Sequence, residues 1–357
     1  MAAAVLTATF LAQTPASAQT NIASLQRSAP VTSHGTWVAW SQYDPRTERF
    51  RLMRRSGGET VPLPVAGRRV PFDIDLGPDE RTGVAAVYSR CRIEPNLGDP
   101  RVRQWAAGTP QWSTGRGCDL YKFTFATGRE TRIGGASTAG ASEFLPTIWK
   151  GHVAFARVYT RRAGAAGARA YLYHRSISGR GRSSGLPEPP RAERGRVEPG
   201  PSAMDLSGRR LGLAWETNRQ GPLSEIDLVT IGGGRRLIER VGSGEIQTVN
   251  LVSAGIRAGW LHYGQGNFGD STSGDLRRFK FSGAEAHETA AASPDRMLLA
   301  TAPVSGGAYA LVSGGVQAGC FPVADIEGET VIRAPCALDR VAPVAWRSYA
   351  PRRFRLR

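Results

Sequence analysis

The sequence predicts an all-β fold, a β-propeller of six blades. Short apolar runs alternate with turns along the whole chain, which contains 43 Gly and 23 Pro, and this composition is typical of many short strands. The runs recur at a period of about 45–50 residues, which indicates a repeat fold. No stretch of useful length shows the 3.6-residue apolar period of an amphipathic helix, so a helical solenoid is not expected.

The period is measured between apolar anchors of successive units. These anchors are Trp40, Val87, Phe155, Trp215, Trp260 and Leu311. They are separated by 47, 68, 60, 45 and 51 residues, and the two long gaps contain the two longest expected loops. Several strands per unit at this period indicate propeller blades. Two β-sandwich domains are the competing all-β interpretation, and seven blades are the alternative to six, because Trp346 could begin another unit.

Each expected strand is an apolar, β-branched or aromatic run that ends near a glycine turn. In the first three units these runs are residues 37–40, 49–53, 61–63, 73–79, 83–89, 118–123, 131–133, 146–149, 151–156 and 170–173. In the last three units they are residues 204–215, 225–229, 236–238, 256–261, 276–281, 293–300, 307–312, 323–325 and 341–346. The two-residue alternation places Leu120 and Lys122 on one face of a sheet, and Tyr121, Phe123 and Phe125 on the other.

Two of these units carry a recognisable turn before an apolar strand. The turns are Leu206-Ser207-Gly208 and Ser293-Pro294-Asp295, and Gly77-Pro78-Asp79 is a looser match. The units resemble the TolB-type propeller repeat, a WD-like repeat in which Pro and Asp fix a tight turn. The resemblance covers most of residues 30–335 and implies an extracytoplasmic binding scaffold. The repeats begin soon after the expected cleavage site, so we expect no counterpart of the α/β domain of TolB, no role in the Tol system and no transferred catalytic residues.

The two ends of the chain differ in composition from the repeats. Residues 1–18 combine an apolar run with Ala16-Ser17-Ala18, which is typical of a signal peptide cleaved after Ala18. Residues 19–346 are then expected to form a single propeller domain, with a mobile insertion over 178–201 that lacks an apolar period. Residues 347–357 form an Arg-rich C-terminal tail. No later run reaches the ~18 apolar residues of a spanning helix, so a secreted or envelope-associated monomer is expected.

The chain contains four cysteines, Cys91, Cys118, Cys320 and Cys336. An even number in an exported chain favours disulfides, and three connectivities are open. The pairs Cys91–Cys118 and Cys320–Cys336 are favoured because each closes a local loop within one repeat. Metal binding by the cysteines is a minor alternative, since no C-x-x-C pair or His-rich spacing supports a zinc site. We expect no cofactor and no metal.

Basic residues set the charge of the chain. The 46 Lys and Arg against 30 Asp and Glu give a formal net charge of +16, which attracts polyanions, although an Arg-rich solvated surface gives the same composition. The candidate anion-binding residues lie in segments of flexible composition and are Arg161, Arg162, Arg180, Arg182, Arg191, Arg194 and Arg196. Two aromatic contact candidates, Trp105 and Trp112, could stack on sugars or bases or pin their loop to a blade.

Motifs of the common enzyme classes are missing. The sequence contains no His-Glu-x-x-His or Walker motif, and no Gly-x-Ser-x-Gly or dinucleotide fingerprint at a strand-to-helix turn. Asp73, Asp75, Asp79 and Glu80 could supply oxygen ligands to Ca²⁺, but capping of turns is the favoured interpretation. His152 begins a strand and could face the central channel, where we expect a structural role.

Two functions are open at this point. The first is an exported, non-enzymatic propeller scaffold that binds a protein or an anionic cell-envelope polymer; nucleic acid is not expected. The alternative is an exported propeller hydrolase or lyase that acts on glycans, which would need paired carboxylates or a metal in the central funnel. Acidic or His side chains from three or more blades near the axis would discriminate between them.

Overall fold

The computed structural model describes residues 23–25, 31–81, 83–94, 115–159, 170–188, 200–217, 223–241, 245–253, 259–266, 274–280, 288–291, 296–303, 308–315 and 339–345. These residues form 24 β-strands, which assemble into six four-stranded antiparallel sheets. No helix in this part of the chain is long and apolar enough to cross a membrane.

The first four sheets follow the chain without crossovers. Blade 1 contains β2 (Val31–His34), β3 (Trp37–Asp44), β4 (Arg49–Ser56) and β5 (Glu59–Pro62). Blade 2 contains β6 (Asp75–Pro78), β7 (Val84–Ile93), β8 (Arg116–Thr124) and β9 (Arg129–Arg132). Blade 3 contains β10 (Ala141–Trp149), β11 (His152–Tyr159), β12 (Tyr171–Ser176) and β13 (Ser184–Gly185). Blade 4 contains β14 (Pro201–Ser207), β15 (Arg210–Thr217), β16 (Leu223–Thr230) and β17 (Arg235–Val241).

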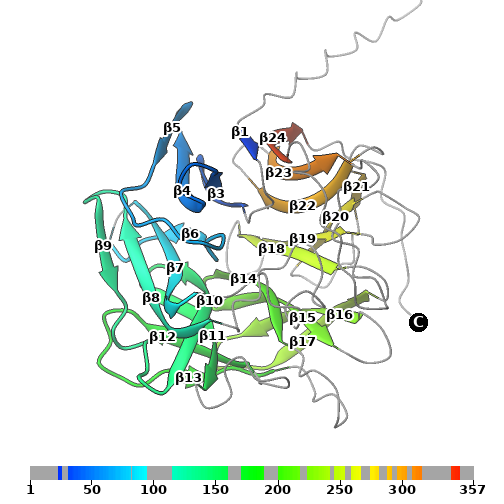
Figure 1. Cartoon of the computed structure of the whole chain (residues 1–357). Coiled ribbons are helices and arrows are strands. Elements are labelled where there is room, and N and C mark those ends of the chain that lie inside the picture. The colour runs from blue at the N-terminus through cyan, green and yellow to red at the C-terminus, as the bar shows by residue number, and fades with distance from the viewer. Residues whose placement is uncertain are drawn as a thin grey trace, which may run out of the picture.

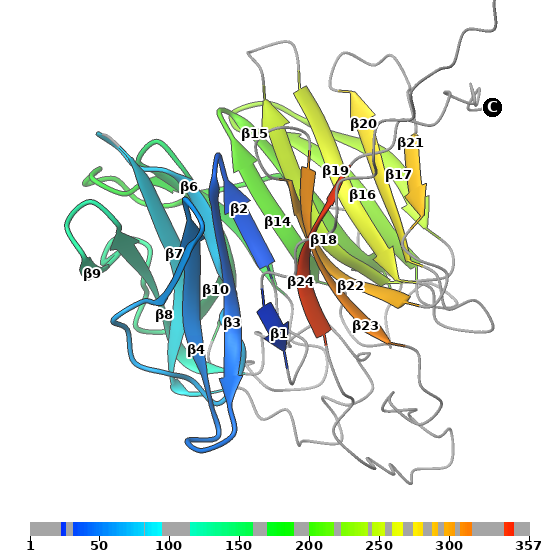
Figure 2. The ribbon, with the colours of Figure 1, turned by 90° about the horizontal axis from the view of Figure 1, so that it is seen from above.

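The last two sheets close the ring. Blade 5 contains β18 (Glu245–Ser253), β19 (Gly259–Gly266), β20 (Gly274–Lys280) and β21 (Glu288–Ala291). Blade 6 contains β22 (Arg296–Pro303), β23 (Ala308–Gly315), β24 (Asp339–Ala345) and, as its outermost strand, β1 (Ala23–Leu25) from the other end of the chain. In β1, Ala23 pairs with Val341 and Leu25 with Asp339; Figure 2 shows β1 beside β24.

The six sheets follow one another around a common centre (Figure 1). The first strand of each blade contacts the first strands of both neighbouring blades, in the closed order β2, β6, β10, β14, β18 and β22. The expected six-bladed propeller is therefore confirmed. The seven-blade alternative is wrong, because β24 ends at Ala345 and completes the sixth sheet.

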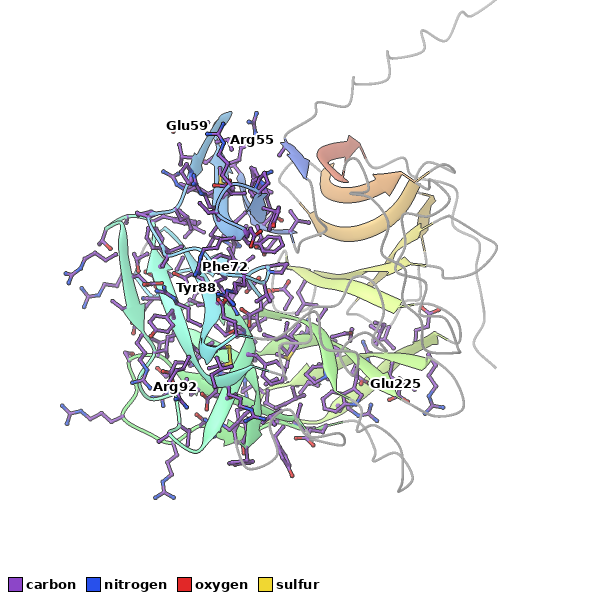
Figure 3. The ribbon with its side chains drawn as sticks, in the orientation of Figure 1. Arg55, Glu59, Phe72, Tyr88, Arg92 and Glu225 are labelled. Atoms are coloured by element: carbon purple, nitrogen blue, oxygen red, sulfur yellow. A yellow bond between two sulfur atoms is a disulfide. The ribbon has the colours of Figure 1, made fainter. Side chains whose placement is uncertain are left out.

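Apolar side chains fill the spaces between neighbouring blades. Alternation along β7 directs Ala86 and Tyr88 toward blade 1, and Ala85 and Val87 toward blade 3. The Tyr88 ring meets Phe72 edge to face, with ring centroids 5.4 Å apart (Figure 3). Because both faces of such a strand are buried, its sequence is a continuous apolar run. A third apolar layer joins blades 3 and 4.

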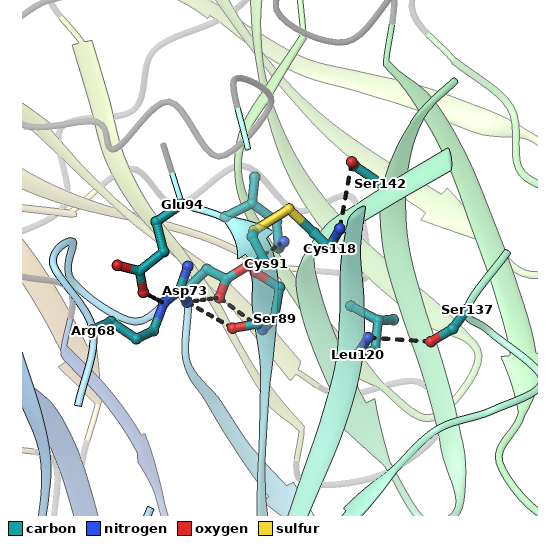
Figure 4. The surroundings of a disulfide bond; sticks show 10 residues. Arg68, Asp73, Ser89, Cys91, Glu94, Cys118, Leu120, Ser137 and Ser142 are labelled. Carbon is teal, nitrogen blue, oxygen red and sulfur yellow. Dashed lines mark hydrogen bonds and ion pairs between the residues drawn. A yellow bond between two sulfur atoms is a disulfide. The ribbon is translucent and has the colours of Figure 1, made fainter. Parts of the chain in front are cut away.

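One expected disulfide is present. Cys91 of β7 and Cys118 of β8 are register partners, and their sulfur atoms are bonded (Figure 4). The bond joins residues 27 apart in sequence, and closing a loop of that length stabilises a fold by about 3.5 kcal/mol in the chain-entropy treatment. Cys320 and Cys336 lie outside the described residues, as do residues 1–18 and 347–357.

Part of the segment expected to be an insertion belongs to blade 3. Within residues 178–201, Ser184–Gly185 forms β13, which pairs with Tyr173 and His174 of β12. Leu186 N also donates a 2.9 Å hydrogen bond to Leu172 O. Residues 189–199 of this segment lie outside the described residues.

Blades 2 and 3 approach each other closely at Gly77 of β6. A Cβ atom at this position would overlap the backbone carbonyl oxygen of Ile148 in β10. A backbone oxygen inside a strand cannot move away as the end of a flexible side chain can. Glycine at position 77 therefore sets the distance between two neighbouring inner strands.

Replacing Gly77 by Ala should destabilise the protein. We expect Gly77→Ala to lower the free energy of unfolding by roughly 1–3 kcal/mol, the usual cost of overpacking a core, as measured by urea denaturation. Gly134→Ala is the matched control, because a Cβ there would meet no heavy atom within 4 Å. Equal stability of the two variants would contradict the close approach of β6 and β10.

Candidate functional site

The centre of the propeller is the first place to look for a site, because six inner strands converge there. Each inner strand pairs with its own blade on one side only. Its other edge presents backbone amides that need acceptors, since an unsatisfied buried N–H group is costly.

Side chains of the preceding blade supply these acceptors. The hydrogen bonds run from Leu76 N to Thr32 Oγ1 (3.1 Å), from Ile148 N to Asp75 Oδ2 (2.9 Å), from Leu206 N to Thr147 Oγ1 (2.7 Å) and from Leu251 N to Asp205 Oδ2. In each strand the acceptor residue directly precedes the donor residue, as in Asp75-Leu76. We call Thr32, Asp75, Thr147 and Asp205 the axial ring.

A second set of hydrogen bonds joins the members of the axial ring to one another. Thr32 Oγ1 donates to Asp75 Oδ1 at 3.1 Å, and Thr147 Oγ1 donates to Asp75 Oδ2 at 2.8 Å. Thr147 Oγ1 also lies 3.4 Å from Asp205 Oδ1. A hydroxyl has one proton, so the shorter contact to Asp75 receives it. The two carboxyl groups therefore face one another across a single threonine hydroxyl.

Burial changes the proton affinity of both carboxyl groups. It raises the pKa of Asp75 to about 6, although the hydrogen bonds from Ile148, Thr147 and Thr32 act in the opposite direction. Burial and the charge of Asp75 raise the pKa of Asp205 well above its ordinary value. The axis thus concentrates acidic groups that hold protons more tightly than exposed carboxyls do.

The oxygen atoms of the axial ring already accept hydrogen bonds within the protein, so the ring has a structural role. Both oxygens of Asp75 accept hydrogen bonds, and the residue is only 8% exposed. A general acid or base has to reach the substrate atom that it protonates or deprotonates. Asp205 is less buried, but its carboxylate accepts from Leu251 N of blade 5. The two acids therefore connect neighbouring blades.

An aromatic contact lies two residues beyond the axial-ring positions on the inner strands. The rings of His34 in β2 and Trp149 in β10 meet edge to face, with centroids 6.0 Å apart. These residues come from blades 1 and 3, and β6 of blade 2 contributes Gly77 at the equivalent position. Burial lowers the pKa of His34, so its imidazole is neutral at neutral pH. At this level of the axis the His34 and Trp149 side chains therefore join blades 1 and 3.

The four acids considered as calcium ligands have separate protein partners. Asp73 accepts from Ser89 N and Leu145 N, each at 2.8 Å, and from buried Arg68 (Figure 4). Asp79 pairs with Lys122 at 2.8 Å and accepts from Glu80 N, and Glu80 accepts from Ser178 Oγ at 2.7 Å. Among the described residues, no three His, Cys, Asp or Glu side chains could hold a metal ion.

Two of the remaining sequence candidates belong to the described residues. Arg180 and Arg182 are exposed in the turn between β12 and β13. Residues outside the described part of the chain are Arg161, Arg162, Arg191, Arg194, Arg196, Trp105 and Trp112. The strand ends that flank residues 160–169, at Tyr159 and Tyr171, lie at the end of blade 3 opposite the turn with Arg180.

His152 does not face the axis. It begins β11, the second strand of blade 3, and stacks on His174 of β12 with ring centroids 5.2 Å apart. The axial ring was not predicted as a unit. The repeated dipeptide in Asp75-Leu76 and Asp205-Leu206 is a signal that could have revealed two of its members, because both precede the turn of the TolB-like motif.

Comparisons with known proteins find solved structures that are similar to this chain at low sequence identity. No protein-family model and no curated protein matches the sequence. TolB from Acinetobacter baumannii is similar with a TM-score of 0.42 and 11% identity, over 72% of this chain and 52% of that one. The six-bladed lectin of Aleuria aurantia is similar with a TM-score of 0.46 and 10% identity, over 81% of this chain and 88% of the lectin. Penicillium chrysogenum alpha-L-arabinanase is similar with a TM-score of 0.49 and 10% identity, over 91% of this chain and 97% of the arabinanase. The chain thus spans about half of the TolB chain.

The raised pKa of Asp75 predicts a specific pH dependence of stability. An exposed Asp titrates near 3.9, and Asp75 titrates at about 6 in the folded state. Between these values the folded state holds a proton that the unfolded state has lost, so the free energy of unfolding falls as pH rises. The loss approaches about 1.4 kcal/mol per pH unit for one such group.

Urea denaturation at pH 5 and pH 7.5 measures this effect. The Asp75 carboxyl should stabilise the folded state more at pH 5 than at pH 7.5, whereas the lowered pKa values of His34 and His174 act in the opposite direction in wild type and variant alike. In Asp75→Asn, which keeps an acceptor oxygen but cannot titrate, the difference between the two pH values should be smaller. An equal difference in both proteins would contradict a raised pKa at Asp75.

Proposed function

We propose that the protein is an exported, non-enzymatic binding scaffold for an anionic cell-envelope polymer. The observation that carries this proposal is the opposite placement of acidic and basic groups. Acidic side chains at the axis bind the neighbouring blades, whereas arginines such as Arg180 and Arg182 are exposed in the turns.

Buried acids make the surface more basic than the formal charge suggests. Among the described residues, the buried acidic side chains are Asp73, Asp75, Glu143, Glu225 and Asp227. The buried arginines are Arg68, Arg157 and Arg175. The excess of buried acids leaves additional positive charge facing solvent, on a chain whose formal charge is already +16. A field of this sign attracts phosphate- or carboxylate-bearing polymers.

The expected compartment agrees with this function. A disulfide such as Cys91–Cys118 persists in oxidising environments outside the cytoplasm. The TolB-like repeats and the signal peptide expected over residues 1–18 support export to the envelope or beyond. The propeller would act there as a monomer that offers its turns to the ligand.

A glycan hydrolase or lyase is the second candidate. Asp205 favours it, because this residue is partly exposed at the axis and the pKa of its carboxyl is raised, as a general acid requires. Catalysis would require Asp205 to exchange its hydrogen bond from Leu251 N for a substrate oxygen. The engagement of Asp205 with blade 5 supports the scaffold over the enzyme.

Binding to isolated cell envelopes across a NaCl series tests the scaffold. We expect binding to weaken as salt screens the charges. Arg180→Gln/Arg182→Gln should weaken binding roughly threefold to tenfold at low salt, because two surface charge contacts are each worth about 0.2–1 kcal/mol. A triple Gln variant of Arg191, Arg194 and Arg196 tests residues 189–199 without removing β13.

The matched control is Arg46→Gln/Arg129→Gln. Both residues are exposed on blades 1 and 2, so this variant removes the same net charge from other blades and should bind as wild type. Binding that is indifferent to salt would contradict the proposal. Loss of binding after protease treatment of the envelopes would identify a protein ligand in place of the polymer.

A further inference from the structure

Three turns meet at one end of blade 3. Ile177 N, at the start of the β12–β13 turn, donates a 2.7 Å hydrogen bond to Gly151 O in the β10–β11 turn. Ser178 Oγ donates at 2.7 Å to Glu80 Oε1, which belongs to the β6–β7 turn of blade 2. These contacts bring the exposed side chain of Lys150 to the base of the turn that carries Arg180 and Arg182.

Lys150 has an unfavourable backbone conformation. It forms, with Gly151, the two-residue loop between the register partners Trp149 and His152. Both loop residues have positive φ, 43° for Lys150 and 75° for Gly151, as in a type I′ turn. Asn and Gly are favoured at the first of these positions, and Lys is strained there. Strain of this kind persists where a side chain serves a function, and here it places a cation beside the β12–β13 turn.

Two imidazoles lie next to this turn. His152 directly follows Gly151, and its register partner on β12 is Ser176. His174 lies two residues before Ser176 and pairs with Ala154, so it occupies the diagonal position next to His152. The rings are nearly parallel, at 10°, with centroids 5.2 Å apart. Burial and the neighbouring His152 lower the pKa of His174 to about 4, so at neutral pH its ring is an uncharged group with one N–H donor.

The surrounding charge favours an anion over a metal ion. A stacked pair of imidazoles can bind a transition metal, but Lys150, Arg180 and Arg182 would repel a cation. No third metal ligand joins the pair among the described residues. Two acids lie at these turns: Glu80 accepts the Ser178 hydroxyl, and Asp79 is paired with Lys122. Three cations with N–H donors are the groups that bind oxyanions.

We propose that Lys150, His152, His174, Arg180 and Arg182 form an oxyanion-binding site, called here the turn site, for the phosphate or carboxylate groups of the polymer. The choice of ligand class rests on the proposed function. Arginine binds such groups in a bidentate manner, lysine adds a point charge, and the imidazoles supply directed N–H donors. The site is at the end of blade 3 and is separate from the axial ring.

The imidazole ¹H–¹⁵N signals of the five histidines report on the turn site directly. Full-length mature protein at pH 7 is titrated with inorganic pyrophosphate and, separately, with trigalacturonate. We expect the signals of His152 and His174, assigned through His→Gln variants, to move and saturate while the signal of His34 stays in place. A response to pyrophosphate alone identifies phosphate groups, and a response to trigalacturonate alone identifies carboxylates. Unmoved signals with both anions would overturn the turn site.

Lys150→Asn separates binding from folding. Asn is favoured at this φ and has no charge, so the variant should have a higher Tm than wild type and bind the responding anion about twofold to fivefold more weakly. Arg129→Gln, which removes an exposed charge from the β8–β9 turn of blade 2, should bind as wild type. Wild-type affinity in Lys150→Asn would overturn the role of Lys150.

The two proposals fail in different ways. If the imidazole signals of His152 and His174 move with pyrophosphate but envelope binding does not change with salt, the turn site is supported and the proposal of an anionic envelope ligand is wrong. If envelope binding is sensitive to salt and the imidazole signals do not move, the scaffold stands and its anion site is elsewhere. The His34 signal supplies an internal reference in both cases.

Discussion

An inner propeller strand has one edge without a strand neighbour, and its amides need acceptors that the blade itself cannot provide. Here Thr32, Asp75, Thr147 and Asp205 each bind an amide of the following blade. This interaction fixes the spacing of the blades at the axis. Gly77 permits the close approach of β6 to β10, and the apolar layers between the sheets fill the distance that the hydrogen bonds set.

The same interaction determines where function can reside. Carboxyl groups that bind neighbouring blades lie inside, where burial raises the pKa values of Asp75 and Asp205. The enzyme alternative depends on freeing Asp205. Exposed cations lie instead on the turns, and at the end of blade 3 three turns converge on Lys150 and the stacked histidines. The axis thus provides the frame, and the turns provide the chemical groups that can meet a ligand.

Features that depend on neighbours in the sequence could be predicted. Glycine-bounded apolar runs predicted six blades, the short loop predicted Cys91–Cys118, and alternation placed Leu120 and Phe123 in different inter-blade layers, as the structure shows. Features that depend on distant partners could not. Ala23–Leu25 has no strand pattern and pairs with Val341 and its neighbours. Asp75 resembles a turn cap in the sequence, because its donor Ile148 is 73 residues away.

Hydrogen exchange at the amide of Leu206 tests the axial ring most directly. This amide lies on the unpaired edge of β14, and its acceptor is Thr147 Oγ1 of blade 3. In Thr147→Val, which has a similar shape but no hydroxyl, the Leu206 amide should exchange faster relative to the Leu213 amide within the sheet of blade 4. If the ratio of the two exchange rates equals that of wild type, Thr147 does not protect Leu206, and hydrogen bonding between inner strands is not what holds the blades together.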